Sequence, residues 1–550
     1  MHTPIRLSTL ALALVGSSFA FAQVPPDAGR VLQDMVIPPA PIPPSTDLKL
    51  EDRAPLDETA PGGQQIELKA VRFSGMTRFD EEHLRGVISG AIGKSHDLAA
   101  LRNLAQRITR FYREQSYPFA RAYLPPQRMA DGDLLIEVIE GRYGKVTAVG
   151  EAKLAAQAQP FLSALKHDDV IEGTQLERTA LILGDQPGVL LTPVVKPGAE
   201  VGTGDLEARV SSGPAFEGKL GVDNHGNRYS GRHRALASVN WNSPFMFGDQ
   251  LSASALLTDE SQWFGQLAYA MPLGTSGLRG QIGYAHTYYE LGKEFSNLDA
   301  TGTAKIASVG LSFPLIRTRT RNLILSAQYQ HKDLQDEYGS VDVTNDKSSD
   351  SLPVMLQFDV RDNYAGGGIT YGALVWMPGD LSLDSRDLKD QDRLTPKSEG
   401  GFQKLTLDIA RLQRLPNNFS LFGRFSGQLA DKNLDSSESF SLGGASGVRA
   451  YPQGEGAGDK GWLAQIELRY AVGELAPYVF YDAGKVTNKV SPWAASDNHR
   501  SISGFGTGVR WTRGDFGVDA SIAWAAHGGN PESDIRDTQP RLWVKAEYRL

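Results

Sequence analysis

The sequence predicts an all-β transmembrane barrel of about 16 antiparallel strands, preceded by two small α/β domains and an N-terminal helix with a linker. Three observations predict this fold class. The N-terminus has the pattern of an export signal, and two similar α/β patterns follow it. Segments of about ten residues that alternate apolar and polar side chains then fill the rest of the chain.

Residues 1–22 have the pattern of a secretory signal peptide. Arg6 precedes an apolar run from Leu7 to Phe21, and the run ends in Ala20-Phe21-Ala22, a small-x-small cleavage site. The alternative is a short buried helix. We expect the mature chain to begin near Gln23, in the periplasm or beyond. The sequence contains no Cys, which suits an oxidising compartment and excludes thiol catalysis, thiolate zinc sites and disulfides.

Residues 23–37 are predicted to form a short helix, because Asp27 follows two prolines at the position of an N-cap. The apolar face of this helix consists of Val31, Leu32 and Met35. Residues 38–64 are predicted to be a proline-rich linker that stays extended. A helix at the end of such a linker should either dock on the rest of the protein or move freely. The alternative is a disordered tail.

Two α/β modules are predicted at 65–141 and 142–213, each of ordinary small-domain size. The first shows the order β-α-α-β-β, and an internal repeat relates the second to it. Two modules of one kind in tandem indicate binding of a polypeptide and not catalysis, since an exposed sheet edge can accept an extended peptide as an added strand. The repeat pairs 71–75 with 146–150, and 132–141 with 204–213.

The barrel is predicted for residues 214–550, where charged side chains occupy one face of strand after strand. Inside lipid such a sheet must close, because an open edge leaves backbone groups unpaired. A soluble all-β sandwich has the same period and is the alternative. The segments 251–257, 463–470 and 541–550 show the alternation; in the second, Ala464, Ile466, Leu468 and Tyr470 oppose Gln465, Glu467 and Arg469.

Other classes of function are excluded or disfavoured by composition and motifs. The net charge is -8 with no basic block, which argues against nucleic acid. After the N-terminus no run of about 18 apolar residues exists, so a bundle of membrane helices is excluded. Residues 456–461 match Gly-x-Gly-x-x-Gly but do not lie between a strand and a helix, and the ten His residues form no metal motif. We predict no enzyme, cofactor or metal site.

The chain resembles the outer-membrane transporters of two-partner secretion, the haemolysin activation/secretion proteins, over nearly all of its mature length. The resemblance implies a helix that can plug the barrel, two periplasmic POTRA domains, a 16-stranded barrel and a long extracellular loop folded into the lumen. It depends on the order and spacing of these stretches: PPDAGR at 25–30, YLPPQRMADGDLLIEVIEGRYGKV at 123–146, DNHGNRYSGRHR at 223–234, NSPFMFGDQL at 242–251, GGASGVRAYP at 443–452 and YVFYDAGKV at 478–486.

The family's loop tip is Val-Arg-Gly-Tyr, and its wall motif is Phe-x-Asp-x-Gly. The replacement of the tip glycine by alanine leaves the loop conformation open. The matching residues here are Val448, Arg449, Ala450 and Tyr451 at the tip, and Phe480, Asp482 and Gly484 on the wall.

The residues themselves also predict a pair between tip and wall. A period of two places Asp482 on one face of its strand with Phe480, and a carboxylate facing lipid would be costly, so this face should be lumenal. A buried carboxylate calls for a cation, and the guanidinium of Arg449 fits it bidentately. The alternative is a solvated loop arginine and an unpartnered lumenal charge.

The resulting hypothesis is an outer-membrane transporter with its POTRA domains in the periplasm. It captures one secreted protein (an adhesin, a cytolysin or a contact-dependent toxin) by strand addition and conducts it unfolded, without a nucleotide. An assembly factor that inserts other barrels and a passive porin are the alternatives. The candidate substrate contacts are Arg121, Arg128, Lys145 and Arg178, each of which could equally be a solvated surface charge.

Overall fold

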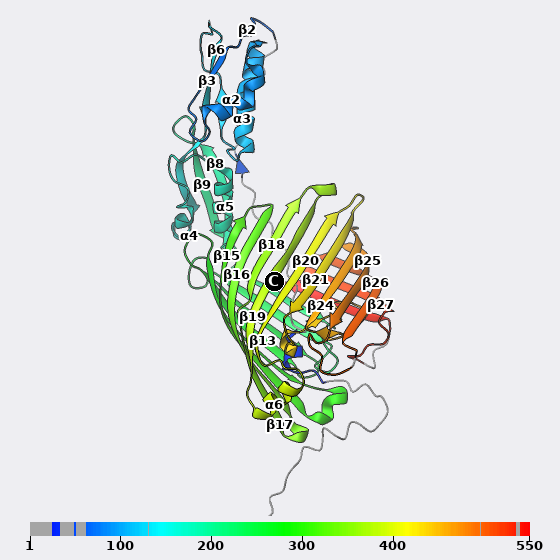
Figure 1. The fold of residues 1–550 in the computed structure, drawn as a ribbon. Coiled ribbons are helices and arrows are strands. Elements are labelled where there is room, and N and C mark those ends of the chain that lie inside the picture. The colour runs from blue at the N-terminus through cyan, green and yellow to red at the C-terminus, as the bar shows by residue number, and fades with distance from the viewer. Residues whose placement is uncertain (1–24, 34–48, 51–61, 130, 496, 535–538) are drawn as a thin grey trace, which may run out of the picture.

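The computed structural model describes residues 25–33, 49–50, 62–129, 131–495, 497–534 and 539–550. The predicted signal peptide, Met35 of the predicted helix and most of the linker lie outside these ranges. Figure 1 shows two small α/β domains stacked at one end of a barrel, with α6 and β17 near its other end. Among the described residues, no helix is both long and apolar enough to cross a membrane.

The first α/β domain has a three-stranded sheet in the order β3-β6-β5, with β3 and β6 parallel. Helices α2 and α3 are each capped by an aspartate, Asp80 and Asp97, and bury Leu84 and Ile108 against the sheet. Its elements are β2 (Ile66–Glu67), β3 (Ala70–Ser74), α2 (Glu81–Ile88), η2 (Ser89–Ala91), β4 (Ser95–His96), α3 (Leu98–Glu114), β5 (Arg121–Tyr123) and β6 (Asp133–Ile139).

The second domain repeats this plan, which confirms the predicted β-α-α-β-β order. Its first and last strands are parallel, as in the first domain: Val146 lies opposite Leu206, just as Val71 lies opposite Leu134. The short strand β1 (Lys49–Leu50) pairs in parallel with β8. The other elements are β7 (Arg142–Gly150), α4 (Ala152–Ala158), η3 (Gln159–Leu162), α5 (Gly173–Gly184), β8 (Val189–Pro197) and β9 (Thr203–Ser212).

A buried carboxylate near the junction of the two domains holds the first domain together. Glu140, 3% exposed, accepts hydrogen bonds from the backbone of Thr77 and Arg78 and from the Tyr112 hydroxyl. Burial raises the pKa of Glu140, but these hydrogen bonds outweigh it and hold the pKa below its usual value.

The barrel closes because the first strand, β10, pairs with the last, β28. In the part of the chain that the structure describes, seventeen strand segments form the ring. Segments β17 and β18 both lie between β16 and β19 and are separated only by Leu352 and Pro353, so they form one interrupted strand. Proline cannot donate to the ladder, which explains the interruption. The barrel therefore has 16 strands, one fewer than the number of segments, as the sequence predicts.

The strands are β10 (Phe216–Asp223), β11 (Arg234–Asn242), β12 (Gln250–Thr258), β13 (Trp263–Pro272), β14 (Arg279–Glu290), β15 (Ala300–Arg317), β16 (Arg321–Tyr338), β17 (Val343–Ser351), β18 (Val354–Asp362), β19 (Gly368–Leu383), β20 (Gly400–Arg414), β21 (Phe419–Ala430), β24 (Lys460–Tyr470), β25 (Leu475–Thr487), β26 (His499–Arg513), β27 (Phe516–His527) and β28 (Arg541–Arg549). Between strands lie η4 (Lys293–Leu298), η5 (Gly339–Val341), η6 (Tyr364–Gly366) and α6 (Arg386–Leu394).

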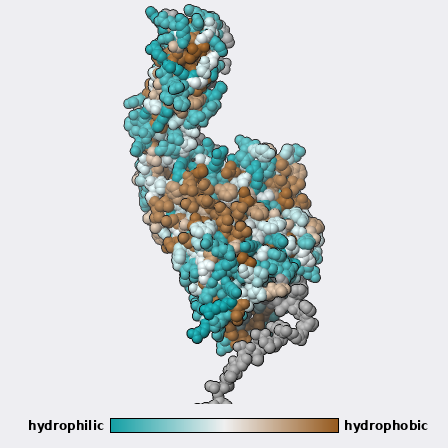
Figure 2. All heavy atoms as spheres, viewed as in Figure 1, coloured by the Kyte–Doolittle hydropathy of each residue, from teal (hydrophilic) through white to brown (hydrophobic). Residues whose placement is uncertain are grey.

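The apolar face of each strand points away from the lumen, as the alternation predicts. On β24, Ile466 and Leu468 are exposed on the outer surface, whereas Glu467 between them is buried inside. On β28, Leu542 lies outside and Trp543 inside. Figure 2 shows hydrophobic residues gathered across the visible face of the barrel, below the two domains. This band matches the lipid-facing surface of an outer-membrane barrel.

The second domain is fixed to the barrel rim by ion pairs. Arg317 on β15, 4% exposed, donates to both carboxylate oxygens of Asp185 at 2.6 and 2.7 Å. The guanidinium of Arg319 donates to Glu177 of α5 at 2.9 Å. Because the bidentate geometry restricts rotation as well as distance, this junction orients the domain over the barrel mouth.

Candidate functional site

The candidate site is built by the connection between β21 and β24, residues 431–459, which folds back into the barrel lumen. It contains η7 (Ser436–Glu438) and the two short paired strands β22 (Phe440–Ser441) and β23 (Ala457–Gly458). Its tip is completely enclosed: Val448, Ala450 and Tyr451 have no exposed surface. We call residues 431–459 the lumenal loop.

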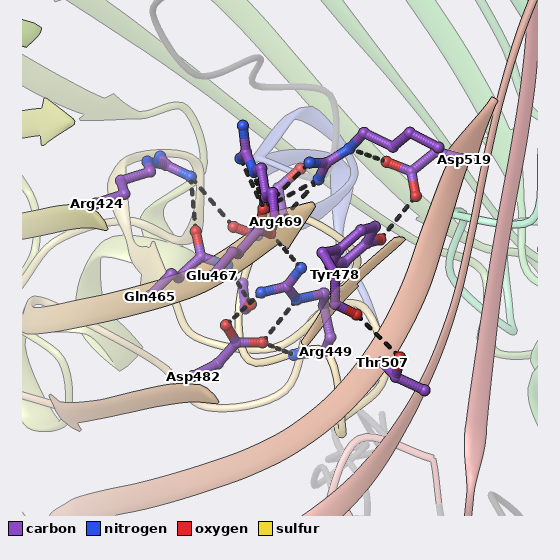
Figure 3. A network of polar contacts seen from close by, with 12 residues as sticks. Arg424, Arg449, Gln465, Glu467, Arg469, Tyr478, Asp482, Thr507 and Asp519 are labelled. Carbon is purple, nitrogen blue, oxygen red and sulfur yellow. Dashed lines mark hydrogen bonds and ion pairs between the residues drawn. The ribbon is translucent and has the colours of Figure 1, made fainter. Parts of the chain in front are cut away.

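Arg449 at the tip of the lumenal loop lies against Asp482 on β25. Its Nε and Nη2 donate to the two carboxylate oxygens of Asp482 at 2.8 and 2.7 Å, and its backbone N–H donates to the same carboxylate at 3.1 Å (Figure 3). The guanidinium also lies 3.5 Å from the ring centroid of Phe480, a cation–π contact. The structure thus brings together three of the predicted tip and wall residues.

A second carboxylate, Glu467 on β24, completes the site. Its Oε1 accepts from Nη1 of Arg449 at 2.6 Å, and its Oε2 lies 2.6 Å from Arg469 and 3.2 Å from Arg510. Figure 3 shows Glu467 close to Arg449 and Arg469. The alternation placed Glu467 on the polar face of its strand, but no local signal in the sequence paired it with the loop tip.

The glycine of the wall motif makes room for the loop. A Cβ added to Gly484 would lie 2.6 Å from the side chain of Leu442, so only glycine allows the loop to pack this closely. Ala450 does not have a positive φ, and its methyl group lies against Gly504, where an added Cβ would approach it to 2.3 Å. The alanine at the tip therefore fits without glycine's conformational freedom.

The backbone of the tip is held as firmly as its side chains. The indole of Trp543 on β28 donates to the carbonyl of Arg449 at 2.7 Å, and Gln539 donates to the carbonyl of Ala450 at 2.6 Å. The Tyr451 hydroxyl donates to the carbonyl of His527 at 2.9 Å. The tip is therefore attached to the wall through β27 and β28 as well as through the ion pair with β25.

The N-terminal helix α1 (Ala28–Gln33) also lies inside the barrel. Asp27 accepts from the backbone N–H of Arg30 at 2.9 Å, the geometry of an N-cap. Ala28 and Val31 pack against Tyr229, Tyr289 and other residues of the barrel wall, with Leu32 partly buried in the same cluster. The backbone N–H of Ala28 donates to Asp336 of β16 at 2.8 Å.

The base of the lumenal loop and the helix share a lysine. Lys347 on β17 lies 2.8 Å from Asp435 of the loop and 3.4 Å from Asp27 of the helix. Ser436 of the loop donates to Asp27 at 2.6 Å. Glu438 is fully buried between Lys332 and Lys404, which come from β16 and β20. The helix therefore rests on the same loop whose tip is bound to the wall.

The four cationic residues predicted to contact a substrate lie in different settings. Arg121 on edge strand β5, Arg128 after it and Lys145 on edge strand β7 are exposed. Arg178 donates to the carbonyl of Pro314 on β15 at 2.8 Å and lies over the ring of Phe313. The guanidinium of Arg178 therefore lies at the junction with the barrel, and its contact with a substrate stays a prediction.

Among the described residues, no group of His, Cys, Asp and Glu side chains could hold a metal ion. The charges of the site instead neutralise one another, and they join a loop to a wall. Such an arrangement fixes the loop tip in one position against the barrel wall.

A closed barrel with an apolar outer band, two α/β domains at one end and a loop bound inside its own lumen has the architecture of an outer-membrane transporter. The comparisons specify the family. Residues 202–511 match the family described as haemolysin secretion/activation protein ShlB/FhaC/HecB, and residues 66–141 match the POTRA domain of ShlB type. The chain belongs to this haemolysin secretion/activation family. It is an outer-membrane protein whose POTRA domains lie in the periplasm.

Individual relatives agree with this assignment. The chain is 27% identical over 538 residues to the heme/hemopexin transporter protein HuxB of Haemophilus influenzae, with 94% of each chain covered. It is 23% identical to the hemolysin transporter protein ShlB of Serratia marcescens, covering 86% of this chain and 85% of that one. The structure of CdiB from Escherichia coli has the same fold, with a TM-score of 0.73, 17% identity and coverage of 90% and 93%.

Proposed function

We propose that the protein recognises one large secreted protein in the periplasm and conducts it, unfolded, through the barrel lumen to the cell surface. The observation that carries this proposal is the resting lumen, which holds both α1 and the lumenal loop through polar contacts as well as apolar packing. Both segments would have to move for a polypeptide to pass.

The edges of the POTRA sheets support capture of the partner by strand addition. Arg121 and Lys145 lie on β5 and β7, strands with only one paired neighbour each among the described residues. On the other side of the second sheet, β8 is already paired with Lys49–Leu50 of the chain's own linker. A partner strand could add to a free edge directly, but at β8 it would have to displace the linker.

The nature of the partner is inferred from the relatives. Their names connect them with haemolysin and with hemopexin, and ShlB is called a haemolysin transporter. We infer that the cargo is likewise a secreted protein, and that its folding outside the cell supplies the driving force. The proposal assigns no catalytic step to the chain. The barrel-assembly alternative gains no support from these relatives, because they are named as transporters.

Deletion of the gene should stop export of the large secreted protein encoded beside it. Immunoblots of medium, surface and periplasm should show the partner lost from outside the cell and degraded in the periplasm. Re-expression of the full chain should restore export, and a chain lacking residues 65–141 should reach the membrane without restoring it. Unchanged export in the deletion strain would contradict the proposal.

A further inference from the structure

The turn between β11 and β12, residues 243–249, carries three consecutive large apolar side chains that point in two directions. The side chain of Phe247 packs on Phe161 in the core of the second POTRA domain, with 5.4 Å between ring centroids. Phe245 and Met246 point away from the protein and are 72% and 46% exposed. Large apolar groups so exposed on a turn indicate a surface that is covered in the working protein.

The turn is held rigidly in this orientation. The carboxylate of Asp249, with no exposed surface, accepts from the backbone N–H groups of Phe245 at 3.3 Å and Met246 at 3.1 Å. The hydroxyl of Ser243 donates to the carbonyl of Pro187 in the POTRA domain at 2.6 Å. Phe245 and Met246 are therefore presented by fixed contacts and do not simply lie on a loose loop.

Phe245 continues a row of aromatic rings on the outer surface of the barrel. Ring centroids are 5.6 Å apart for Phe216 and Trp241, 5.9 Å for Trp241 and Phe245, and 5.9 Å for Phe245 and Tyr269. Phe216 begins β10 directly after the POTRA domain and lies opposite Trp241, so this row marks the periplasmic end of the strands.

The row joins the lipid-facing band without a break. Leu220 and Val239 lie on the same outer face as Phe216 and Trp241 and are 48% and 41% exposed. Tyr and Trp favour the membrane–water interface, where an apolar ring meets lipid and its polar edge meets water. Because the POTRA side of the turn is already filled by Phe247, the outer side faces the periplasmic leaflet.

We propose that the turn 243–249 is a membrane anchor that inserts Phe245 and Met246 into the periplasmic leaflet of the outer membrane. The ligand is the boundary between phospholipid headgroups and acyl chains. Since Phe247 and Ser243 attach the same turn to the second POTRA domain, the anchor sets the height of that domain above the bilayer. This inference does not depend on the identity of the secreted partner.

The chain lacks Cys, so single labels can be placed without background. Phe245→Cys and Met246→Cys would each carry a nitroxide in the full chain, reconstituted in phosphatidylethanolamine/phosphatidylglycerol vesicles. Collision with oxygen, which concentrates in lipid, is compared with collision with a nickel chelate, which stays in water. Leu267→Cys on the lipid face, 53% exposed, and Val201→Cys in the POTRA domain, 93% exposed, are the references.

Labels at 245 and 246 should collide with oxygen more often than with the nickel chelate. The ratio of the two collision rates should place both labels at a depth between the membrane surface and the Leu267 label. Collision with nickel as frequent as at 201 would overturn the proposal, because the turn would then lie in water. Protection from both reagents would also overturn it, because the turn would then be covered by protein. All four sites are exposed, so each labelled chain should fold as the parent does.

Discussion

Arg449→Ala should abolish export of the partner while leaving the folded barrel in the outer membrane. The substitution leaves Asp482 buried without its cation, whereas Glu467 keeps Arg469 and Arg510. Breaking a buried pair in this way typically costs about 3–5 kcal/mol. The loop tip then loses its fixed position in the lumen, so the wall surface that the partner should follow is no longer formed, whereas the strand ladder is untouched. Export is measured as partner in the medium, and barrel integrity as the heat-modifiable band on gels of outer-membrane fractions.

Asp482→Ala should have the same effect, and the double variant should be no worse than either single variant, because both changes break one interaction. Arg449→Lys should rescue poorly, since an ammonium cannot form the paired parallel bonds. Arg411→Ala is the matched control: it breaks a similar pair with Asp362, at 2.8 and 3.0 Å, that touches no part of the lumenal loop. Normal export by both single variants would contradict a role for the pair.

Removal of residues 23–37 should raise the conductance of the channel in planar bilayers by opening the part of the lumen that α1 occupies. Lys347→Met should act in the same direction, because it leaves the half-buried carboxylates of Asp27 and Asp435 close together without the lysine that they share. The helix should then spend more time outside. Open-channel events in single-channel recordings are the measurement.

Lys389→Met provides the control for this series. Lys389 lies on α6 and pairs with Glu399 at 3.2 Å, away from the contacts of α1. Its removal changes the net charge by the same amount as Lys347→Met and should leave conductance unchanged. If removal of residues 23–37 also leaves conductance unchanged, α1 is not a plug.

The parts of the fold that local patterns determine were predictable from the sequence. Alternation identified the lipid face of β24 and β28, because neighbouring residues of a strand must point to opposite sides. The repeat identified the two α/β domains as copies of one plan, but the parallel pairing of their first and last strands was not predicted. The break between β17 and β18 was not predicted, although Pro353 marks it.

The parts of the site that depend on strand neighbours were less predictable. Arg449 and Asp482 were paired from the family motif and from the lumenal position of the carboxylate. The contact of Glu467 with Arg449 requires β24 to lie beside β25 at one particular register, which no local pattern specifies. The same holds for Lys347, which meets Asp27 across 320 residues of sequence.

The tip alanine shows how the structure answers a question that the motif left open. A glycine at this place in the family suggests a special backbone angle, yet Ala450 adopts none. Glycine is needed instead on the barrel wall. Gly484 leaves room for the side chain of Leu442, and Gly504 leaves room for the methyl group of Ala450. Substituting either wall glycine would therefore disturb the site more than the natural alanine does.

Translocation by the purified chain alone tests the central claim most directly. Proteoliposomes containing only this protein, with the POTRA domains outward, would be mixed with the unfolded N-terminal secretion domain of the partner and then treated with protease. The account predicts a protected, full-length domain inside vesicles that carry the parent chain, and only background protection with Arg449→Ala. No protection with the parent chain, or equal protection in vesicles without it, would contradict the claim that this lumen is the export path.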